Sequence, residues 1–198
     1  MRTVFLGSPP FATPVFERLV RSGHRPLALV TLPDKPKGRN REVEPSELAL
    51  AARAHEISVL QPADPHAPEF LDALRALAPD VLVVASYGVI LKPALLELAP
   101  HGALNVHGSL LPRWRGASPI QAAVLAGDAR TGVSIQRIVL ALDEGDVLLA
   151  KERASGARET SGDLFDALAL LGGDALVEAL DLLEHGRAVF TPQDGSRA

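Results

Sequence analysis

Two polar side chains able to do chemistry stand two residues apart, at Asn105 and His107, where an apolar run ends. On a β-strand, side chains at this spacing leave the same face, so both can reach one ligand. An asparagine amide is a neutral donor suited to an oxyanion, and an unperturbed histidine titrates near neutral pH. The pattern indicates acid–base chemistry beside a polarised oxygen. The residue types alone leave a second interpretation open, a hydrogen-bonded turn with no catalytic role.

The surroundings of His107 set it apart from the other histidines, which are expected in loops or on helix surfaces. A long irregular loop follows it and carries the only tryptophan, Trp114. Between two predicted strands, the acidic run of Asp143, Glu144 and Asp146 offers a carboxylate able to orient the histidine or a water molecule. None of the 6 histidines has a partner at metal-ligand spacing, so we expect no metal site.

The elements that must position these residues alternate between apolar runs of strand length and stretches of helical period. This alternation predicts an α/β fold with a Rossmann-like, mostly parallel twisted sheet and helices on both faces. Ligands bind such sheets at the carboxyl ends of the strands, where Asn105 and His107 are expected. Strands are predicted at residues 4–7, 27–32, around 59, 81–85, 103–107, 133–140 and 147–153. Helices are predicted at 11–21, 47–55 after a Ser46 cap, 70–77, 119–126 after a Ser118 cap, and 164–183 with a bend at Gly172–Gly173.

Composition narrows the class of protein. The chain has 198 residues, 47% of them hydrophobic, which is enough to bury a core. It has no cysteine, so disulfides, thiolate zinc sites and cysteine nucleophiles are excluded. No run approaches the ~20 apolar residues that span a membrane, so we expect a cytoplasmic protein, and we expect it to be a monomer. A net charge of −4 argues against a general nucleic-acid coat, so any RNA contact must be local.

Several motifs, in order along the chain, resemble the methionyl-tRNA formyltransferase family. The run from Asn105 to Gln121, with Leu110-Leu111-Pro112 and Trp114 inside it, looks like that family's active-site segment, and the family's downstream Leu142-Asp143 is present. Further matches begin at Phe5, Pro33, Ala85 and Thr160, so the resemblance covers roughly residues 1–190.

The resemblance implies roles for individual residues. Asn105 would donate to the oxyanion that forms when an amine attacks the formyl group of 10-formyltetrahydrofolate. His107 would polarise the formyl oxygen or help to move protons, and Asp143 would hold a water or the histidine. The family's folate-binding positions correspond here to Tyr87, Gly88, Val89, Ile90 and Leu91, to the backbone of Ser109, Leu110, Leu111 and Pro112, and to the loop from Leu140 to Asp143.

The resemblance also implies an acceptor, the amino group of initiator methionyl-tRNA. A loop from Pro33 to Pro45 corresponds to a segment that the family places against the tRNA acceptor end. Its four cations are a local phosphate-binding patch, although Glu42 and Glu44 dilute it. The alternative is a solvated loop with no partner. The cations expected to bind tRNA are Lys35, Lys37, Arg39 and Arg41 in this loop and Arg113 and Arg115 near the active-site segment.

Related activities remain as alternatives. The same catalytic trio serves formyltransferases that act on a sugar nucleotide or another small amine, and a hydrolase that releases formate from formyltetrahydrofolate. A degenerate, non-catalytic folate-binding domain is a further alternative, against which the intact Asn105, His107 and Asp143 argue. Pro9 and Pro10 lack N–H groups, so the first loop is a poor phosphate cradle. We expect a catalytic domain at residues 1–190 and a frayed tail or linker start at 191–198. The family's C-terminal β-barrel domain is not in this sequence, which leaves an excised domain and a natural short form equally open.

Overall fold

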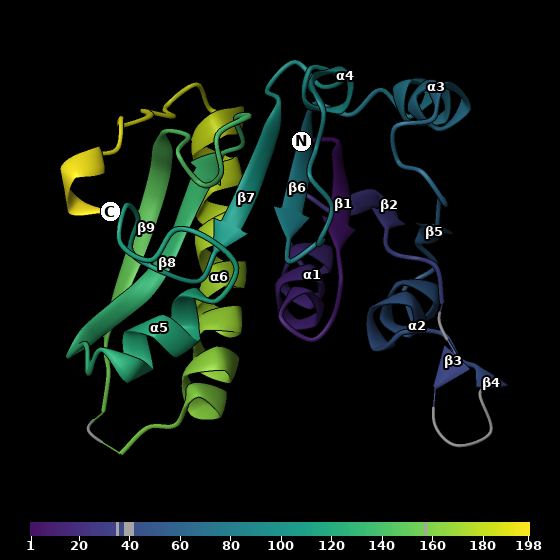
Figure 1. Ribbon diagram of the computed structural model, residues 1–198. Helices are drawn as coiled ribbons and strands as arrows, with labels where there is room; N and C mark the ends of the chain where they lie inside the picture. The colour runs from purple at the N-terminus through teal and green to yellow at the C-terminus, as the bar shows by residue number, and fades with distance from the viewer. Residues whose placement is uncertain (35, 38–41, 157) are drawn as a thin grey trace.

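The computed structural model describes residues 1–34, 36–37, 42–156 and 158–198, with the backbone alone at 36, 37 and 42. Within these residues, one sheet of seven strands has the order β5-β2-β1-β6-β7-β8-β9 (Figure 1). The five strands from β5 to β7 are parallel, and β8 and β9 join antiparallel at one edge. The strands are β1 Thr3–Gly7, β2 Pro26–Val30, β5 Ser58–Leu60, β6 Val81–Ala85, β7 Ala103–His107, β8 Arg130–Arg137 and β9 Val147–Ala154.

Helices cover both faces of the sheet, as predicted. Helices α1, α2, α5 and α6 enclose one apolar cluster around Phe5 and Phe16, whereas α3 and α4 pack on the opposite cluster around Leu82. Their bounds are α1 Ala12–Val20, α2 Glu47–Ala54, α3 Pro68–Ala76, α4 Pro93–Leu96, α5 Pro119–Leu125 and α6 Ser161–Glu184. The short strands β3 Pro36–Lys37 and β4 Glu42–Val43 pair separately, and a 3-10 turn spans Gly195–Arg197. No helix in the described residues is long and apolar enough to cross a membrane.

Chain order explains where a ligand can bind. The chain runs outward from β1 to β2 and β5, then returns to β6 on the other side of β1. A crevice opens outside the carboxyl ends of parallel strands at such a reversal. The segments that leave β1, β6 and β7 therefore share one edge of the sheet, and Asn105 and His107 lie on β7 at that edge.

The strand predicted at 133–140 is shifted: β8 begins at Arg130 and ends at Arg137. Beyond it the Ile138 amide donates to the Ala103 carbonyl on β7 at 2.8 Å, and the Arg137 amide donates to the Asp146 carbonyl at 2.9 Å. The second bond closes the base of a loop from 138 to 146. The apolar residues 139–140 belong to that exposed loop, which is why their hydrophobicity was a poor guide to the strand's end.

Side-chain caps explain where the helices begin, and in one case the beginning differs from the prediction. Helix α6 begins at Ser161, not at 164, because Thr160 and Asp163 form a reciprocal capping box. Ser46 caps α2 as predicted, since its hydroxyl accepts from the Ala49 amide at 3.2 Å. Ser118 occupies the N-cap position of α5 but makes no side-chain cap.

The bend predicted at Gly172–Gly173 is replaced by close packing. Helix α6 is continuous through both residues, which are buried. A Cβ on Gly172 would come within 2.8 Å of a Val106 methyl on β7, and one on Gly173 within 2.7 Å of the Arg18 Cβ on α1. The two glycines allow α6 to approach α1 and the sheet.

This packing generates a stability prediction. Alanine in place of an exposed helical glycine usually stabilises a helix by about 1 kcal/mol. Gly172→Ala should instead lower the free energy of unfolding by about 1–3 kcal/mol, because the new methyl overpacks against Val106. Urea unfolding measures the change. Gly162→Ala is the matched control in the same helix, since its Cβ would meet only the Thr160 hydroxyl at 3.5 Å. Equal stability of the two variants would contradict the packing argument.

Candidate active site

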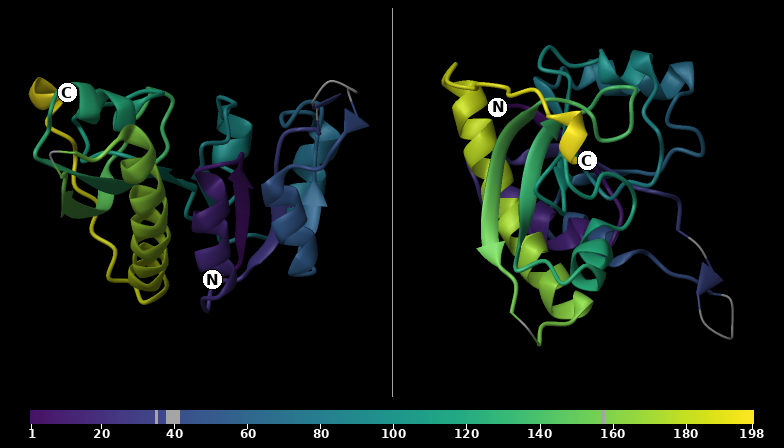
Figure 2. Two further views of the ribbon diagram at one scale, coloured as in Figure 1. Left: turned by 90° about the horizontal axis from the view of Figure 1, so that it is seen from below. Right: turned by 60° about the vertical axis from the view of Figure 1, so that its left-hand side comes forward.

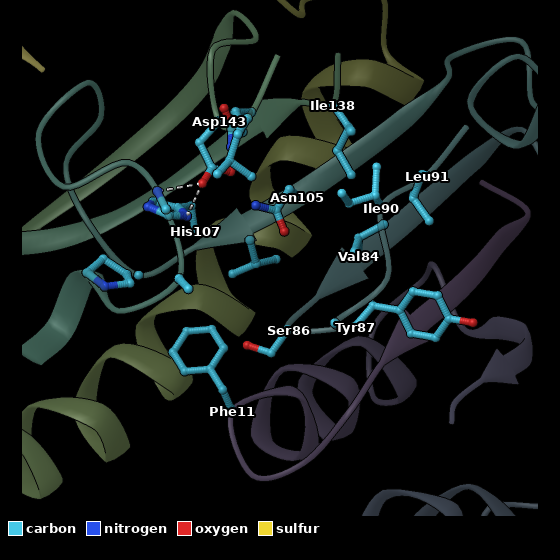
Figure 3. A pocket seen from close by; sticks show the side chains of 18 of the residues that line it. Phe11, Val84, Ser86, Tyr87, Ile90, Leu91, Asn105, His107, Ile138 and Asp143 are labelled. Atoms are coloured by element: carbon cyan, nitrogen blue, oxygen red, sulfur yellow. Dashed lines mark hydrogen bonds and ion pairs between the residues drawn. The ribbon is translucent and has the colours of Figure 1, made fainter. Parts of the chain in front are cut away.

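A cavity of about 600 Å³ opens at the sheet edge where β6 and β7 end (Figure 3). Its walls come from the loop after β6, from β7, from the loop after β8, and from the aromatic rings of Phe11 and Phe165. Those rings meet edge to face with centroids 5.4 Å apart. Asn105, His107 and Asp143, predicted from widely separated parts of the sequence, all line this cavity.

Asn105 and His107 leave β7 on the cavity side, as the two-residue spacing predicts. His107 is buried, whereas Asn105 is half-buried. The Asn105 carboxamide makes no hydrogen bond to the residues that the structure describes, and it points into the cavity (Figure 3). A polar group with unused donors inside an apolar cavity is suited to bind a polar ligand atom.

The orientation of His107 is fixed by the backbone. Its Nε2 lies 3.0 Å from the carbonyl oxygen of Trp114. A carbonyl can only accept, so Nε2 carries the hydrogen, and Nδ1 is the nitrogen that takes up or releases a proton. Nδ1 lies 3.7 Å from Oδ2 of Asp143. That separation suits an ion pair when the ring is protonated, and it is longer than a direct hydrogen bond.

Asp143 is held by two donors besides its proximity to His107. Its Oδ2 accepts from the Gly116 amide and its Oδ1 from Gln136 Nε2, both at 2.8 Å. The residue has φ +53°, in the left-handed region that a non-glycine residue seldom occupies. The fold therefore imposes this backbone conformation on Asp143 to present its carboxylate to the cavity.

The predicted folate-binding residues divide into two groups. Tyr87 to Leu91 and Leu140 line the cavity. At its mouth the side chains of Ile90, Leu140 and Leu142 are 82%, 70% and 70% exposed, an apolar rim that a flat ring could cover. The Tyr87 ring turns away into the core (Figure 3), where burial raises its pKa to about 12, so only its backbone is positioned for a ligand.

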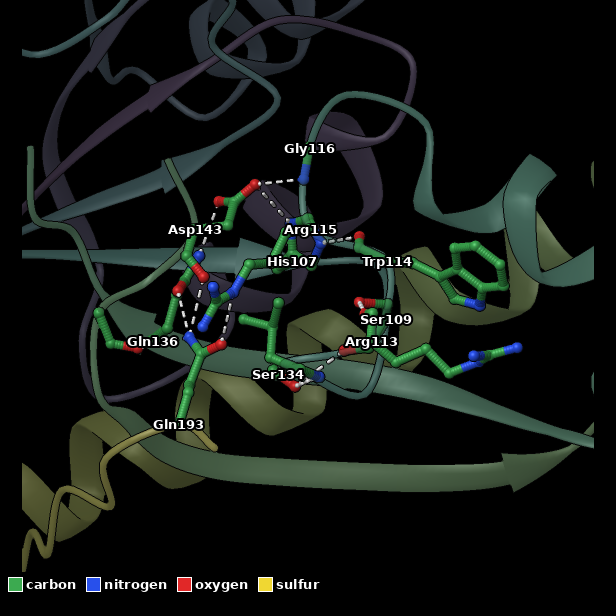
Figure 4. A network of polar contacts seen from close by, with 12 residues as sticks. His107, Ser109, Arg113, Trp114, Arg115, Gly116, Ser134, Gln136, Asp143 and Gln193 are labelled. Atoms are coloured by element: carbon green, nitrogen blue, oxygen red, sulfur yellow. Dashed lines mark hydrogen bonds and ion pairs between the residues drawn. The ribbon is translucent and has the colours of Figure 1, made fainter. Parts of the chain in front are cut away.

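Ser109, Leu110, Leu111 and Pro112 form the second group, and they do not line the cavity. Their backbone faces Ser134 on β8 instead. The Ser134 hydroxyl donates to the Ser109 carbonyl at 2.8 Å and accepts from the Leu111 amide at 3.0 Å. This segment therefore anchors the loop that carries Trp114 and Gly116 (Figure 4).

The cations predicted to bind tRNA fall into two groups, one outside the described residues and one engaged in ion pairs. Lys35, Arg39 and Arg41 lie outside the described residues, as does the side chain of Lys37. Arg113 and Arg115 are engaged within the protein. Arg113 donates through Nε and Nη2 to Asp128 at 2.9 and 2.8 Å, and Arg115 pairs with Glu144 at 3.2 Å. These ion pairs reduce the charge that either arginine can offer to a phosphate.

Sequence analysis missed several residues of the site. Gln136 and Gly116 hold the Asp143 carboxylate, and Phe11 and Phe165 form the cavity wall. Gln193, in the segment expected to fray, donates to the backbone of the Asp143 loop. The alternation along β8 was a usable signal, because it places Ser134 and Gln136 on one face of the strand; the structure shows Gln136 at 1% exposure, where a polar side chain needs a partner.

A histidine–carboxylate group lies outside the cavity. Within the described residues, ligand atoms of His24, Asp181 and Glu184 come within 4.8 Å of one another. The Met1 amino group already lies there, 2.9 Å from His24 Nδ1 and 2.7 Å from Glu184. The group is accounted for by this N-terminal ion pair.

Comparison with known proteins extends these observations. A family model described as formyl transferase matches residues 1–180. The methionyl-tRNA formyltransferase of Anaeromyxobacter dehalogenans (strain 2CP-1 / ATCC BAA-258) is 52% identical over 198 residues, and the alignment covers 100% of this chain and 64% of that protein. The chain thus spans less than two thirds of that relative's length.

Solved structures share the fold at low sequence identity. Glycinamide ribonucleotide transformylase 1 from Symbiobacterium toebii superposes with a TM-score of 0.77 at 19% identity, covering 98% of this chain and 95% of that one. An N-formyltransferase from Helicobacter canadensis, in complex with folinic acid and dTDP-3-aminofucose, gives 0.75 at 17% identity, covering 100% and 69%.

The loop that holds His107 generates a prediction of its own. Asp128 accepts from Arg113 and from Trp114 Nε1, and these bonds lower the pKa of its carboxyl. Ionised Asp128 should therefore stabilise the fold above the ordinary aspartate pKa of about 4, and this contribution should be lost as the pH falls through the lower folded value. Asp128→Ala should lower the melting temperature at neutral pH and expose Trp114 to acrylamide quenching. The difference in melting temperature should shrink below about pH 4.

Asp72→Ala is the matched control for Asp128→Ala. Asp72 also accepts from an arginine, Arg75, at 2.6 Å, but it is exposed and touches no part of the loop. Trp114 is the only tryptophan, so its emission reports this loop alone. Unchanged quenching in Asp128→Ala would show that the loop is held by other contacts.

Proposed function

This chain belongs to the formyl transferase family, and on that premise we propose that it transfers a formyl group from 10-formyltetrahydrofolate to the amino group of methionyl-tRNA. The observation that carries the proposal is the convergence of Asn105, His107 and Asp143 in one apolar cavity. The identity of 52% to a methionyl-tRNA formyltransferase supports the acceptor.

The proposed chemistry is an acyl transfer between two nitrogens. The acceptor amine attacks the formyl carbon, the bond from that carbon to folate N10 breaks, and the proton lost by the amine ends on N10. Negative charge develops on the formyl oxygen during attack. The Asn105 amide is available to donate to this oxyanion, and one such donor is typically worth about 100- to 1,000-fold in turnover.

His107 and Asp143 are proposed to transfer the proton that the attacking amine loses. With Nε2 committed to Trp114, Nδ1 is the His107 atom that can take the proton of the attacking amine. Asp143 lies 3.7 Å from that atom and would stabilise the imidazolium that results. The same separation leaves room for the carboxylate to orient a water that passes the proton to the folate nitrogen.

Folate is proposed to enter between the loop after β6 and the loop after β8. A pterin ring is flat and rich in hydrogen-bonding atoms, which suits a narrow apolar slot with exposed backbone groups. The backbone of 87–91 and the apolar rim of Ile90, Leu140 and Leu142 fit that description. Folinic acid is named in the complex of the Helicobacter canadensis enzyme, which has the same fold.

One assay tests the proposed function against its alternatives. Release of tetrahydrofolate from 10-formyltetrahydrofolate is followed with methionyl-tRNA, with a sugar-nucleotide amine, and with water as the only acceptor. We expect release to be fastest with methionyl-tRNA. Release that is equally fast in water would identify a hydrolase, and a preference for the small amine would identify a small-molecule formyltransferase.

Substitutions in the cavity give a sharper prediction. Asn105→Ala and His107→Ala should lower kcat by about 100-fold or more, because both side chains act on charge that develops in the transition state. The dissociation constant for folinic acid should change little in the same variants. Steady-state kinetics and calorimetric titration measure the two quantities. Parallel loss of folate affinity and turnover would show that the pair shapes the pocket instead.

A second prediction concerns the RNA surface. With Arg113 and Arg115 ion-paired, the cations available for phosphate are mainly the four at positions 35, 37, 39 and 41. The slope of log K against log salt for tRNA should then be no steeper than about −4, and Arg39→Glu with Arg41→Glu should weaken binding. Filter binding across a salt series measures this. Arg187→Glu, at an exposed position after α6, is the control, and an equal effect there would indicate a nonspecific change in charge.

A further inference from the structure

We infer that Gln193, in the segment that follows α6, is a positioning residue for Asp143, acting through Gln136. The inference rests on the proposed function, in which Asp143 serves proton transfer. Three consecutive hydrogen bonds carry it. Arg115 Nε donates to Gln193 Oε1 at 3.0 Å, Gln193 Nε2 to Gln136 Oε1 at 3.2 Å, and Gln136 Nε2 to Asp143 Oδ1 at 2.8 Å (Figure 4).

The direction of this chain is determined by its two ends. A guanidinium has only donors and a carboxylate has only acceptors. Each glutamine between them must therefore present its oxygen toward Arg115 and its amide nitrogen toward Asp143. Hydrogen bonds aligned head to tail polarise one another, so each amide favours the orientation of the next. Two uncharged side chains thus connect a cation to the carboxylate that faces His107.

Gln193 also secures the backbone of the turn that presents Asp143. Its Nε2 lies 2.9 Å from the Asp143 carbonyl oxygen and 2.7 Å from that of Gly145, so its two hydrogens are shared among these carbonyls and Gln136 Oε1. The turn needs this support because Asp143 has φ +53°. Gly145 leaves no space for a larger residue, since a Cβ there would collide with the Arg137 carbonyl. Gln193 therefore supplies side-chain donors to two carbonyls of this turn.

The position of Gln193 is itself fixed by backbone pairing. The amides and carbonyls of Thr191 and Val147 exchange two hydrogen bonds of 2.9 Å, which join the segment after α6 to the start of β9. In Figures 1 and 2 this yellow segment returns alongside β9 toward the loop after β8. Gln193 follows two residues later, and Arg115, at 20% exposure, reaches it from the His107 loop. The Asp143 turn is thus connected to both the His107 loop and the segment after α6.

Two variants distinguish hydrogen-bond donation by the Gln193 amide from simple packing of its side chain. Gln193→Leu removes every polar contact of the side chain while keeping its bulk. Gln193→Glu keeps an acceptor for Arg115 but has no N–H for Gln136, Asp143 or Gly145. If donation positions Asp143, both variants should lower kcat by roughly 10- to 100-fold with little change in folinic acid affinity, because small displacements of a catalytic group cost about that much.

Arg2→Met is the matched structural control. Arg2 also supports a left-handed residue in a turn, donating to the carbonyls of Leu77 and Ala78, and Ala78 has φ +44°. That turn lies where β1 begins, at the opposite edge of the sheet from the cavity. Arg2→Met should therefore lower the melting temperature about as much as the two Gln193 variants do, while its kcat stays within about twofold of wild type.

A second readout does not depend on activity. Hydrogen exchange followed by mass spectrometry should show faster exchange in residues 139–146 in both Gln193 variants and unchanged exchange there in Arg2→Met. Wild-type kcat retained in Gln193→Glu, or unaltered exchange in 139–146, would overturn the inference. A wild-type chain that transfers no formyl group would instead refute the proposed function, and the exchange measurement would still test whether Gln193 positions the turn.

Discussion

The hydrogen bond between His107 Nε2 and the Trp114 carbonyl is the interaction on which the candidate site depends. It assigns a hydrogen to Nε2 and leaves the Nδ1 lone pair facing Asp143 at 3.7 Å. The loop that supplies this carbonyl also supplies the Gly116 amide to Asp143, so one backbone segment orients both groups. Ser134 anchors the start of the loop and Asp128 its middle. An active site assembled in this way relies on correct loop geometry more than on direct contact between its two titratable side chains.

Sheet topology accounts for the place of that loop. The reversal of strand order at β1 opens a crevice beside β6 and β7, and the antiparallel addition of β8 brings the loop from 138 to 146 over it. His107 and Asp143, which lie 36 positions apart in the sequence, are thereby brought together. Leu140 and Leu142 on this loop and Ile90 on the loop after β6 form an exposed apolar rim, and covering such a surface is favourable.

Local patterns in the sequence were sufficient for most of the architecture and for the pairing of Asn105 with His107, whereas Asp143 was selected from its acidic neighbours by the family resemblance. The two-residue spacing of Asn105 and His107 on a strand has one geometric meaning, and apolar runs identified the parallel strands. Contacts between distant segments were not predictable in this way. Gln193 lies in a polar stretch with no periodic signal, and its role follows only from the pairing of Thr191 with Val147. The Gly172–Gly173 pair was interpreted as a helix bend because sequence alone does not reveal a neighbouring helix.

Those two glycines also influence the shape of the cavity. A Cβ at Gly172 would lie 2.8 Å from Val106, the residue between Asn105 and His107, and 3.9 Å from the ring of Phe11. Phe165 lies two turns earlier on the same helix, about 10 Å along its axis, and its ring meets that of Phe11 edge to face. The depth at which α6 packs on the sheet therefore sets where this aromatic wall stands relative to β7. The size of ligand that the cavity admits would then depend on the contact between Gly172 and Val106, which the ligand itself does not touch. Substitutions remote from the reacting atoms could therefore change selectivity.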